Sequence, residues 1–227
     1  MKTRSIDTVL FDLDNTLCVY ERTPKDLLNL SFERVGVDPF FTVEDYFSRF
    51  DDFVDRTSGI AELREECFAS IAEERGHDPE LGRAVAREFA EERDHRNVRF
   101  RPGAREALES LCHKYRTGLV TNGSPGMQRQ KLDSLGILDT FEALVFAGYD
   151  THPKPDPEPF NRALDALGST PDRAVYVGDS IKTDVAGAKS AGLRSVWIPP
   201  IEMDQEVEPS ADYTVETLHG LVPPPWE

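Results

Sequence analysis

Apolar residues recur along the chain with two different spacings, and each spacing predicts its own kind of secondary structure. The run from Thr8 to Phe11 is β-branched or apolar at every position, which predicts a buried strand. From Pro24 to about Asn97, apolar residues recur every three or four positions, as in amphipathic helices. Such helices joined by short loops indicate a bundle, with Phe47 and Phe50 in its core. Four helices are expected: one over Pro24 to Val35, and three marked by the stripes Val43, Tyr46, Phe47, Phe50 and Val54, then Ile60, Leu63, Cys67 and Ile71, then Leu81, Val85 and Phe89.

From Arg101 onward, the pattern changes to strands that alternate with helices. Strands are expected at Thr117 to Thr121, Ala143 to Phe146, Ala174 to Val177, Ser195 to Ile198 and Tyr213 to Val215. Helices are expected to begin at Pro102-Gly103, at Ser124-Pro125 (reaching Leu135), after Asp156-Pro157 (ended by Gly168) and at Lys182 (reaching Ala191). This alternation predicts an α/β fold with a doubly wound parallel sheet covered on both faces.

The first strand determines the expected domain organisation. Its backbone needs strands to pair with, and the helical stretch that follows it offers none. We therefore expect residues 1–17 and 98–227 to form one α/β core. Residues 18–97 would be an α-helical bundle inserted as a cap domain, and 227 residues suffice for two modest domains.

Two aspartates, Asp12 and Asp14, follow directly after the first strand. Residues two positions apart share a face of a strand, so both carboxylates can point into one site. Buried paired carboxylates are costly unless a cation or a shared proton compensates, which favours a metal site, an acid/base pair, or both. The alternative is a strand followed by an ordinary Asx turn, and only partners elsewhere in the chain decide between the two.

Such partners occur at the ends of the later strands. Thr121 and Asn122 end one strand, Lys154 lies in the loop after the next, and Asp179 and Asp184 follow a third. Each cluster alone is an ordinary turn, loop or helix cap. In an open parallel sheet, however, ligands bind at the carboxyl ends of the strands, where all four clusters would meet.

Composition narrows the classes of partner and compartment. The formal net charge of −16 and the sequence pI of about 4.7 disfavour nucleic acid and anionic membranes as partners. No apolar run approaches the length of a membrane span, and the start of the chain lacks the features of a signal peptide, so we expect a cytoplasmic protein. The three cysteines, Cys18, Cys67 and Cys112, are irregularly spaced and are expected to be small buried hydrophobic residues.

The acidic excess also suggests an adaptation to salt. Only 7 of the 26 basic residues are Lys, and high salt screens the mutual repulsion of surface carboxylates. We therefore hypothesise that the protein is adapted to high salt. The alternative is an ordinary acidic enzyme with Arg-rich codon usage.

The four clusters resemble the motifs of the haloacid dehalogenase (HAD) superfamily, in the subgroup with an α-helical (C1-type) cap after the first strand. The matching segments are Asp12-Leu13-Asp14-Asn15-Thr16, Leu119-Val120-Thr121-Asn122-Gly123, Lys154-Pro155-Asp156-Pro157-Glu158-Pro159-Phe160 and Val177-Gly178-Asp179-Ser180-Ile181-Lys182-Thr183-Asp184. The resemblance covers nearly the whole chain, although the cap is matched by pattern only. It implies a Rossmannoid core and a phosphoric monoester hydrolase.

The resemblance also implies a role for each motif residue. Asp12 would be the nucleophile that forms an aspartyl-phosphate, and Asp14 the general acid and then the general base. For this role Asp14 must be protonated when substrate binds, which burial near other carboxylates favours. Thr121, the Asn122 backbone and Lys154 would hold phosphate oxygens. Mg²⁺ would be bound by Asp12, the Asp14 carbonyl and Asp179. Asp184 would support these ligands from behind or bind the ion through a water.

The second aspartate separates functions within the superfamily, because haloacid dehalogenases need no leaving-group acid. We therefore expect a Mg²⁺-dependent phosphatase for a small phosphorylated metabolite, acting as a monomer or homodimer. A sugar phosphomutase has the same motifs and stays open; a dehalogenase and a receiver-like signalling module are remote alternatives. The cap would close as a lid, with specificity residues at Tyr20, Glu21, Arg22 and the loop 56–59.

Overall fold

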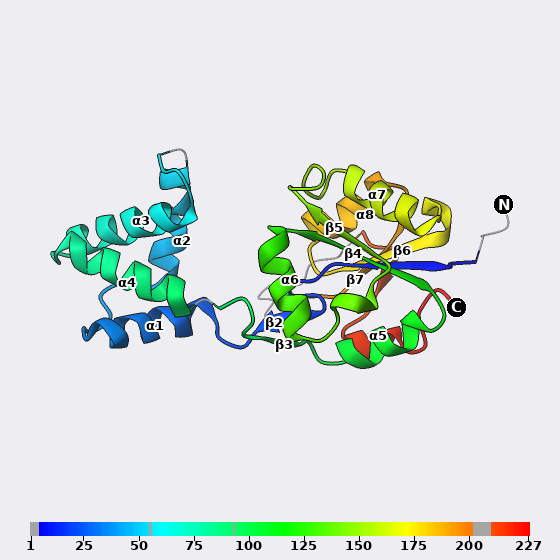
Figure 1. The fold of residues 1–227 in the computed structure, drawn as a ribbon, viewed down its shortest axis with the longest axis horizontal. Coiled ribbons are helices and arrows are strands. Elements are labelled where there is room, and N and C mark those ends of the chain that lie inside the picture. The colour runs from blue at the N-terminus through cyan, green and yellow to red at the C-terminus, as the bar shows by residue number, and fades with distance from the viewer. Residues whose placement is uncertain (1–4, 55, 93, 202–209) are drawn as a thin grey trace. The chain divides into compact units, whose positions relative to one another are not determined.

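The computed structural model describes residues 5–54, 56–92, 94–201 and 210–227, and these form two compact units. One unit combines Met1–Val19 with Val98–Glu227, and the other is Tyr20–Asn97. In Figure 1, the first unit contains both strands and helices, whereas the second unit is mostly helical. That the second unit serves as a lid stays a prediction.

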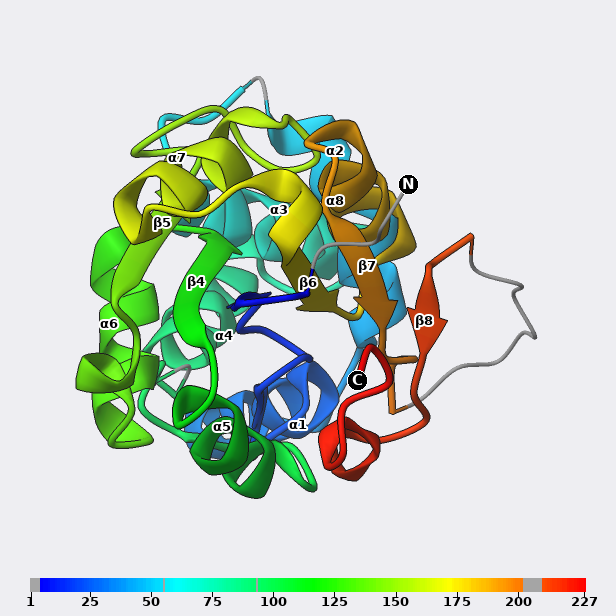
Figure 2. The same ribbon diagram turned by 90° about the vertical axis from the view of Figure 1, so that its right-hand side faces the viewer.

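A parallel sheet forms the centre of the larger unit (Figures 1 and 2). Within the described residues it has six strands in the order β5-β4-β1-β6-β7-β8. Their bounds are Thr8–Phe11 for β1, Arg116–Asn122 for β4, Ala143–Ala147 for β5, Ala174–Gly178 for β6, Arg194–Trp197 for β7 and Tyr213–Thr214 for β8. Because parallel strands connected through helices alternate along this segment, the prediction of a doubly wound α/β fold is confirmed.

The register of the central strands brings their carboxyl ends level. Phe11, the last residue of β1, pairs with Leu119 of β4 on one side and with Val177 of β6 on the other. Asp12, which comes next, donates its backbone N–H to the carbonyl of Val177. The ends of β1, β4 and β6 therefore converge at one edge, where ligands bind in such sheets.

Helices cover both faces of this sheet (Figure 2). Helices α7 (Glu158–Leu167) and α8 (Ala186–Ser190) lie on one face, and α5 (Ala104–Cys112) lies on the other. Helix α6 (Pro125–Ser134) starts directly after β4. The core below α7 and α8 consists of fully or nearly buried apolar side chains, among them Leu10, Val120, Val145, Phe160, Leu164 and Tyr176.

The helix expected from Lys182 to Ala191 is present, but its first turn is wider than that of an α-helix. A π-helical turn spans Ile181–Val185 and only then does α8 begin, so the N–H of Ala186 reaches back to the carbonyl of Ile181. Asp184 explains the wider turn. Its side chain accepts a hydrogen bond from the N–H of Ser180, which holds the start of the turn against the strand end.

The smaller unit contains the four expected helices, α1 (Pro24–Val35), α2 (Val43–Val54), α3 (Ile60–Glu74) and α4 (Pro79–Glu92). Thr23 and Asp26 cap α1 through a reciprocal capping box, and Gly36 ends it with a φ of 81°. The helices enclose an aromatic core, because Tyr46, Phe68, Phe89, Phe32 and Phe41 contact one another in edge-on pairs.

One core assignment in this unit is wrong. Phe47 is 56% exposed, whereas Phe50 is half-buried against the core. Adjacent helical residues point about 100° apart, so the inward position of Tyr46 turns Phe47 outward, where the two rings stack 5.2 Å apart. Val54 and Ile60, at the ends of their stripes, are also exposed.

Two short strands were not predicted. Cys18–Tyr20 (β2) and Val98–Phe100 (β3) pair in a separate two-stranded sheet, and both strands are labelled in Figure 1. Three residues are too few to show an alternating pattern, so sequence periodicity could not find them. Cys18 and Cys67 are buried as expected, while Cys112 is only partly so.

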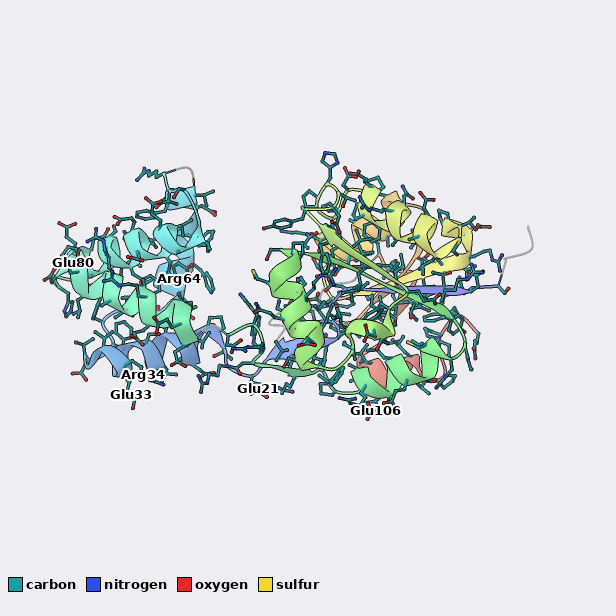
Figure 3. The ribbon with its side chains drawn as sticks, in the orientation of Figure 1. Glu21, Glu33, Arg34, Arg64, Glu80 and Glu106 are labelled. Atoms are coloured by element: carbon teal, nitrogen blue, oxygen red, sulfur yellow. The ribbon has the colours of Figure 1, made fainter. Side chains whose placement is uncertain are left out.

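The surface carries much of the negative charge. Glu21, Glu33, Glu80 and Glu106 are exposed and project away from the ribbon in Figure 3. Arg64, labelled in the same figure, is instead buried, with its guanidinium carbon 5.1 Å from the centre of the Phe89 ring. Within the described residues, no helix combines the length and apolarity needed to cross a membrane.

Candidate active site

Three aspartates meet where β1 and β6 end. Within the described residues, one carboxylate oxygen from each of Asp12, Asp179 and Asp184 lies within 4.8 Å of the others. Asp12 and Asp184 are almost fully buried, and Asp179 is partly buried. The strand ends therefore bring together three of the four acidic residues that the sequence predicted for one site.

Lys154 occupies the centre of this acidic group. Its Nζ lies 2.7 Å from Asp12 Oδ1 and 2.8 Å from Asp184 Oδ1, and it also donates to the hydroxyl oxygen of Tyr176 at 2.8 Å. Only 5% of Lys154 is exposed. A buried ammonium with three oxygen acceptors is fully hydrogen-bonded, and its charge compensates two carboxylates that would otherwise repel each other.

Burial and mutual repulsion shift the protonation of these groups. Burial raises the pKa of Asp12 to about 8; Lys154 opposes this shift, and the charge of Asp184 adds to it. Burial and the charge of Asp184 also raise the pKa of Asp179, to about 6. Burial lowers the pKa of Lys154, but Asp12 and Asp184 outweigh it and leave that pKa above its ordinary value. The site is thus short of positive charge even with Lys154 in place.

Neighbouring groups fix the aspartates after β6. The Asp184 carboxylate accepts from the Ser180 N–H at 2.9 Å through its second oxygen. The backbone carbonyl of Asp179 accepts from the indole of Trp197 at 2.7 Å, and its side chain accepts from the Thr16 hydroxyl at 3.5 Å. Both oxygens of Asp184 therefore already have partners, whereas Asp179 keeps a more open carboxylate.

Asn122 holds the loop that presents Lys154. Its side-chain oxygen accepts from the N–H of Lys154 at 2.9 Å, and its amide nitrogen donates to the carbonyl of Lys154 at 3.2 Å. We predicted only a backbone role for Asn122, so this use of its side chain was missed. Thr121, the preceding residue, is 1% exposed, and its hydroxyl oxygen lies 2.9 Å from Gln128 Nε2.

Asp14 lies in surroundings different from those predicted. We expected burial near carboxylates to favour a protonated Asp14, but its side chain is 35% exposed and paired with Lys131 at 2.6 Å. Gln128 donates to its other oxygen at 2.9 Å. The expected burial of Asp14 among carboxylates is therefore wrong, because a cation and an amide surround its side chain instead.

Four residues of the site neighbourhood were missed: Gln128, Lys131, Tyr176 and Arg101. Arg101 is buried and donates to the carbonyls of Asn15, at 2.5 Å, and of Pro199. It thereby holds the turn after Asp14, where Asn15 has a φ of 57°. The spacing of Gln128 and Lys131, three positions apart on the helix after Thr121, is the one signal that could have indicated a shared face toward the site.

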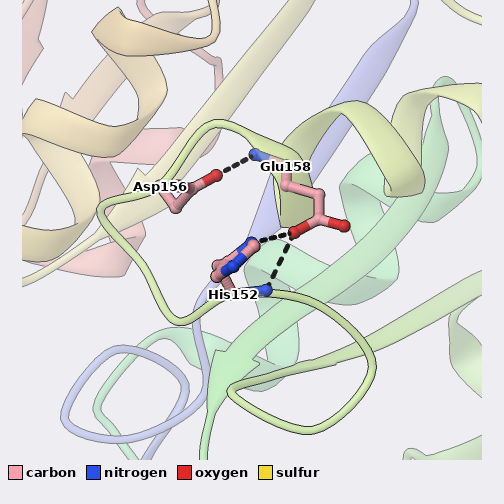
Figure 4. Close-up of side chains that lie close together, drawn as sticks. All are labelled: His152, Asp156 and Glu158. Atoms are coloured by element: carbon pink, nitrogen blue, oxygen red, sulfur yellow. Dashed lines mark hydrogen bonds and ion pairs between the residues drawn. The ribbon is translucent and has the colours of Figure 1, made fainter.

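A second group of possible metal ligands, His152, Asp156 and Glu158, lies nearby in the chain (Figure 4). The Glu158 carboxylate contacts both the ring and the N–H of His152, at 2.6 and 2.9 Å, and the N–H of Glu158 contacts Asp156 at 2.9 Å. His152 and Glu158 are exposed. These contacts close the loop around Lys154 and begin α7.

Comparison with known proteins identifies the family to which this chain belongs. Residues 6–192 match the family model described as "haloacid dehalogenase-like hydrolase". The chain belongs to this family. The resemblance that the four motifs indicated is therefore confirmed, while the subtype of the helical unit stays a prediction.

Among family members, a phosphoserine phosphatase of Thermus thermophilus is 38% identical over 163 residues, 70% of this chain and 64% of the relative. The match thus spans less than two thirds of that relative. The pyrimidine 5'-nucleotidase YjjG of Escherichia coli is 28% identical over 95% of this chain and 96% of its own. The HAD hydrolase YfnB of Bacillus subtilis, in a structure described as bound to magnesium, has a TM-score of 0.70 at 22% identity, covering 96% of this chain and 97% of YfnB.

Proposed function

We propose that this HAD hydrolase is a Mg²⁺-dependent phosphatase that hydrolyses small-molecule phosphate monoesters. The observation that carries the proposal is the pairing of two differently supported aspartates, Asp12 against Lys154 and Asp14 against Lys131. Asp12 lies in a buried acidic cluster that is short of positive charge. Asp14 lies beside this cluster and has hydrogen-bonding partners of its own. A nucleophile and a separate acid/base are what hydrolysis through a covalent intermediate requires.

The donor set fits a magnesium ion. Mg²⁺ prefers oxygen ligands, and the clustered oxygens of Asp12, Asp179 and Asp184 belong to carboxyl groups, two of which have raised pKa values for lack of positive charge. Asp12, the carbonyl of Asp14 and Asp179 would hold the ion. Asp184, whose oxygens already contact Lys154 and Ser180, would support the ligands from behind. When bound, the ion supplies the charge that keeps Asp12 ionised and attracts phosphate.

Asp12 acts as the nucleophile in the first step. One of its carboxylate oxygens attacks phosphorus, and the bond between phosphorus and the leaving oxygen breaks. Asp14 gives its carboxyl proton to that oxygen, so the alcohol leaves neutral. The product is an aspartyl-phosphate on Asp12 and a carboxylate on Asp14.

Water completes the reaction in the second step. The Asp14 carboxylate takes a proton from water as the water oxygen attacks phosphorus, and the bond from phosphorus to Asp12 breaks. Inorganic phosphate leaves, and both aspartates return to their starting forms. Thr121 and Lys154 hold the phosphate oxygens in both steps, since hydroxyl and ammonium donors stabilise the charge that develops there.

Asp14 favours phosphoryl transfer over dehalogenation, which needs no acid for its leaving group. A sugar phosphomutase would use the same residues but return the phosphoryl group to a sugar instead of to water. The two reactions differ in product: inorganic phosphate for the phosphatase, an isomerised sugar phosphate for the mutase.

The test is a phosphate-release screen over a panel of metabolite phosphates, with excess Mg²⁺ or with EDTA, at low and high KCl. We expect at least one metabolite to release phosphate with Mg²⁺ and none with EDTA. The variant Asp12→Asn, which keeps the shape of the side chain, should release none from p-nitrophenyl phosphate. Turnover that persists in EDTA would contradict the metal requirement, and turnover by Asp12→Asn would contradict the nucleophile.

A further inference from the structure

Helix α6 presents two polar side chains to Asp14 from one of its faces. Gln128 and Lys131 are three positions apart, so they are neighbours on the helix surface. Lys131 Nζ lies 2.6 Å from Asp14 Oδ1, and Gln128 Nε2 lies 2.9 Å from Asp14 Oδ2. Each carboxylate oxygen thus has its own donor, which fixes both the position and the plane of the carboxylate.

The orientation of the Gln128 amide follows from its neighbours. Its Nε2 lies 2.9 Å from the Asp14 carboxylate, the Thr121 hydroxyl and the Asn122 carbonyl. A carboxylate and a carbonyl only accept hydrogen bonds, so the NH₂ group must face them. Its Oε1 is buried and has no hydrogen-bond partner in the described part of the chain. The NH₂ group therefore faces Asp14 and Thr121, and this orientation leaves the amide oxygen without a hydrogen bond.

The backbone makes room for this amide. A Cβ atom on Gly123 would lie 2.9 Å from Gln128 Nε2, and Gly123 has a φ of 133°, which side-chain-bearing residues rarely adopt. At the start of α6, the Ser124 hydroxyl accepts from the N–H of Met127 and sets the rotation of the helix. The turn between Thr121 and α6 is thus built so that Gln128 reaches the end of β4.

Lys131 is more buried than the carboxylate it contacts. Its side chain is 3% exposed, whereas that of Asp14 is 35% exposed. Withdrawing an ammonium from water is costly, and a solvent-facing carboxylate alone does not require a buried partner. A short exposed pair would satisfy the charge of Asp14 equally well. The arrangement instead immobilises a carboxylate that remains partly exposed.

We propose that Lys131 and Gln128 are positioning residues that hold the Asp14 carboxylate beside Thr121, where it exchanges protons with the leaving group and with water. This inference rests on the proposed function. The proton that Asp14 gives to the leaving oxygen leaves behind the carboxylate that both donors bind. The same contacts then keep that carboxylate aimed at the water it deprotonates, and no further proton donor or acceptor is needed.

The test compares an alkyl ester, glycerol 2-phosphate, with an activated aryl ester, p-nitrophenyl phosphate. For both esters, kcat/KM reports the first step, and only the alkyl leaving group depends strongly on a placed acid. We expect Lys131→Met to lower kcat/KM for the alkyl ester by roughly tenfold to 100-fold, a fraction of what general acid catalysis supplies. The value for the aryl ester should change less than threefold, and Lys131→Arg should restore most of the loss.

Matched controls separate positioning from general damage. Lys114→Met removes an exposed lysine of the same unit, and Gln130→Leu removes an exposed glutamine from the other side of α6; both should leave the ratio between the two esters unchanged. Gln128→Leu should shift the ratio in the same direction as Lys131→Met. Circular dichroism and thermal unfolding check that each variant is folded. If Lys131→Met does not fold, the test rests on Lys131→Arg and Gln128→Leu.

A double variant distinguishes failure of this inference from failure of the proposed function. In an Asp14→Asn background, Lys131→Met should lower kcat/KM no further, because the group it positions is gone. Equal losses for both esters, or a full additional loss in that background, would overturn the positioning role. If Asp14→Asn alone hydrolysed glycerol 2-phosphate at the wild-type rate, the acid/base assignment itself would be wrong.

Discussion

The ammonium of Lys154 lies 2.7 Å from Asp12 Oδ1, and each of these two residues is only 5% exposed. A buried pair of this kind contributes little net stability when intact, but it is costly to break, because the surviving charge stays buried. Here the loss of Lys154 would leave two carboxylates, those of Asp12 and Asp184, facing each other.

Replacing Lys154 by Met should therefore lower both stability and activity. We expect the free energy of unfolding to fall by about 3–5 kcal/mol at pH 8, and by less at pH 5, where a shared proton replaces the missing cation. Phosphate release should fall by at least about 100-fold, as for loss of one donor to a developing charge. Urea unfolding at both pH values measures the first effect. Lys114→Met is the control, and an equal loss of stability at both pH values would contradict the role of charge.

The pH dependence of stability follows from the raised pKa values of the aspartates. Asp12, with a pKa of about 8, and Asp179, with a pKa of about 6, keep their protons in the folded protein at pH values where the unfolded chain has lost them. The folded state then binds more protons than the unfolded state, so stability falls as pH rises from about 4 to about 8. In EDTA, the unfolding temperature should therefore be higher at pH 5 than at pH 8.

Magnesium should reverse this trend. A cation bound by ionised carboxylates stabilises the folded state, and it competes with protons for the same oxygens. The rise in unfolding temperature on adding Mg²⁺ should thus be larger at pH 8 than at pH 5, as measured by differential scanning calorimetry. Asp179→Asn should reduce that rise. A magnesium effect independent of pH would contradict binding at these carboxylates.

Tyr176 links the cationic centre to the sheet. Its hydroxyl donates to the carbonyl of Val120 at 2.7 Å and accepts from Lys154 Nζ. Burial raises its pKa well above the ordinary value, so it stays protonated as this donor. Tyr176→Phe removes both bonds, and we expect a loss of about 1–3 kcal/mol in the free energy of unfolding.

Activity should respond to this change only modestly. Lys154 keeps its contacts with Asp12 and Asp184 in the variant, so kcat for p-nitrophenyl phosphate should fall by less than about tenfold. Tyr149→Phe, at a residue that is 65% exposed, is the matched control and should change neither quantity. A loss of activity as large as that of Lys154→Met would show that the tyrosine takes part in the chemistry directly.

The sequence was sufficient to bring Asp12, Lys154, Asp179 and Asp184 together, because each lies directly after a parallel strand or in the loop or turn that follows one. Such ends meet at one edge whatever the details of packing. The strands themselves are short, apolar and bounded by turn residues, so their positions could be predicted within one or two residues. The roles proposed for these residues come from the motifs they form.

The partners of Asp14 could not be predicted in the same way. Gln128 and Lys131 lie inside a helix, and which face they present depends on the rotation set by Ser124 and on the room left by Gly123. Tyr176 points into the site region from the middle of β6, although its neighbours are ordinary core residues. Side-chain direction, rather than position along the chain, was the missing quantity in each case.

Exposed carboxylates should make the stability of the fold sensitive to ionic strength. The chain has a formal net charge of −16, and Glu33, Glu80 and Glu106 are among the exposed acids. Salt reduces the range of charge interactions from about 10 Å at 0.1 M to about 3 Å at 1 M. Screening also weakens surface ion pairs such as Arg83–Glu66, at 3.0 Å, but exposed pairs contribute roughly 1 kcal/mol or less each.

Repulsion should therefore dominate, and KCl should stabilise the protein. We expect the unfolding temperature and phosphate release to rise from 0.05 M to 2 M KCl, with most of the rise below 1 M, where the screening length changes most. Sucrose, which favours compact states without screening charge, gives the baseline for effects of solvent exclusion. A variant with two exposed glutamates, Glu33 and Glu106, changed to Gln should need less KCl for the same stability. Full stability and activity without added salt would exclude an adaptation to salt.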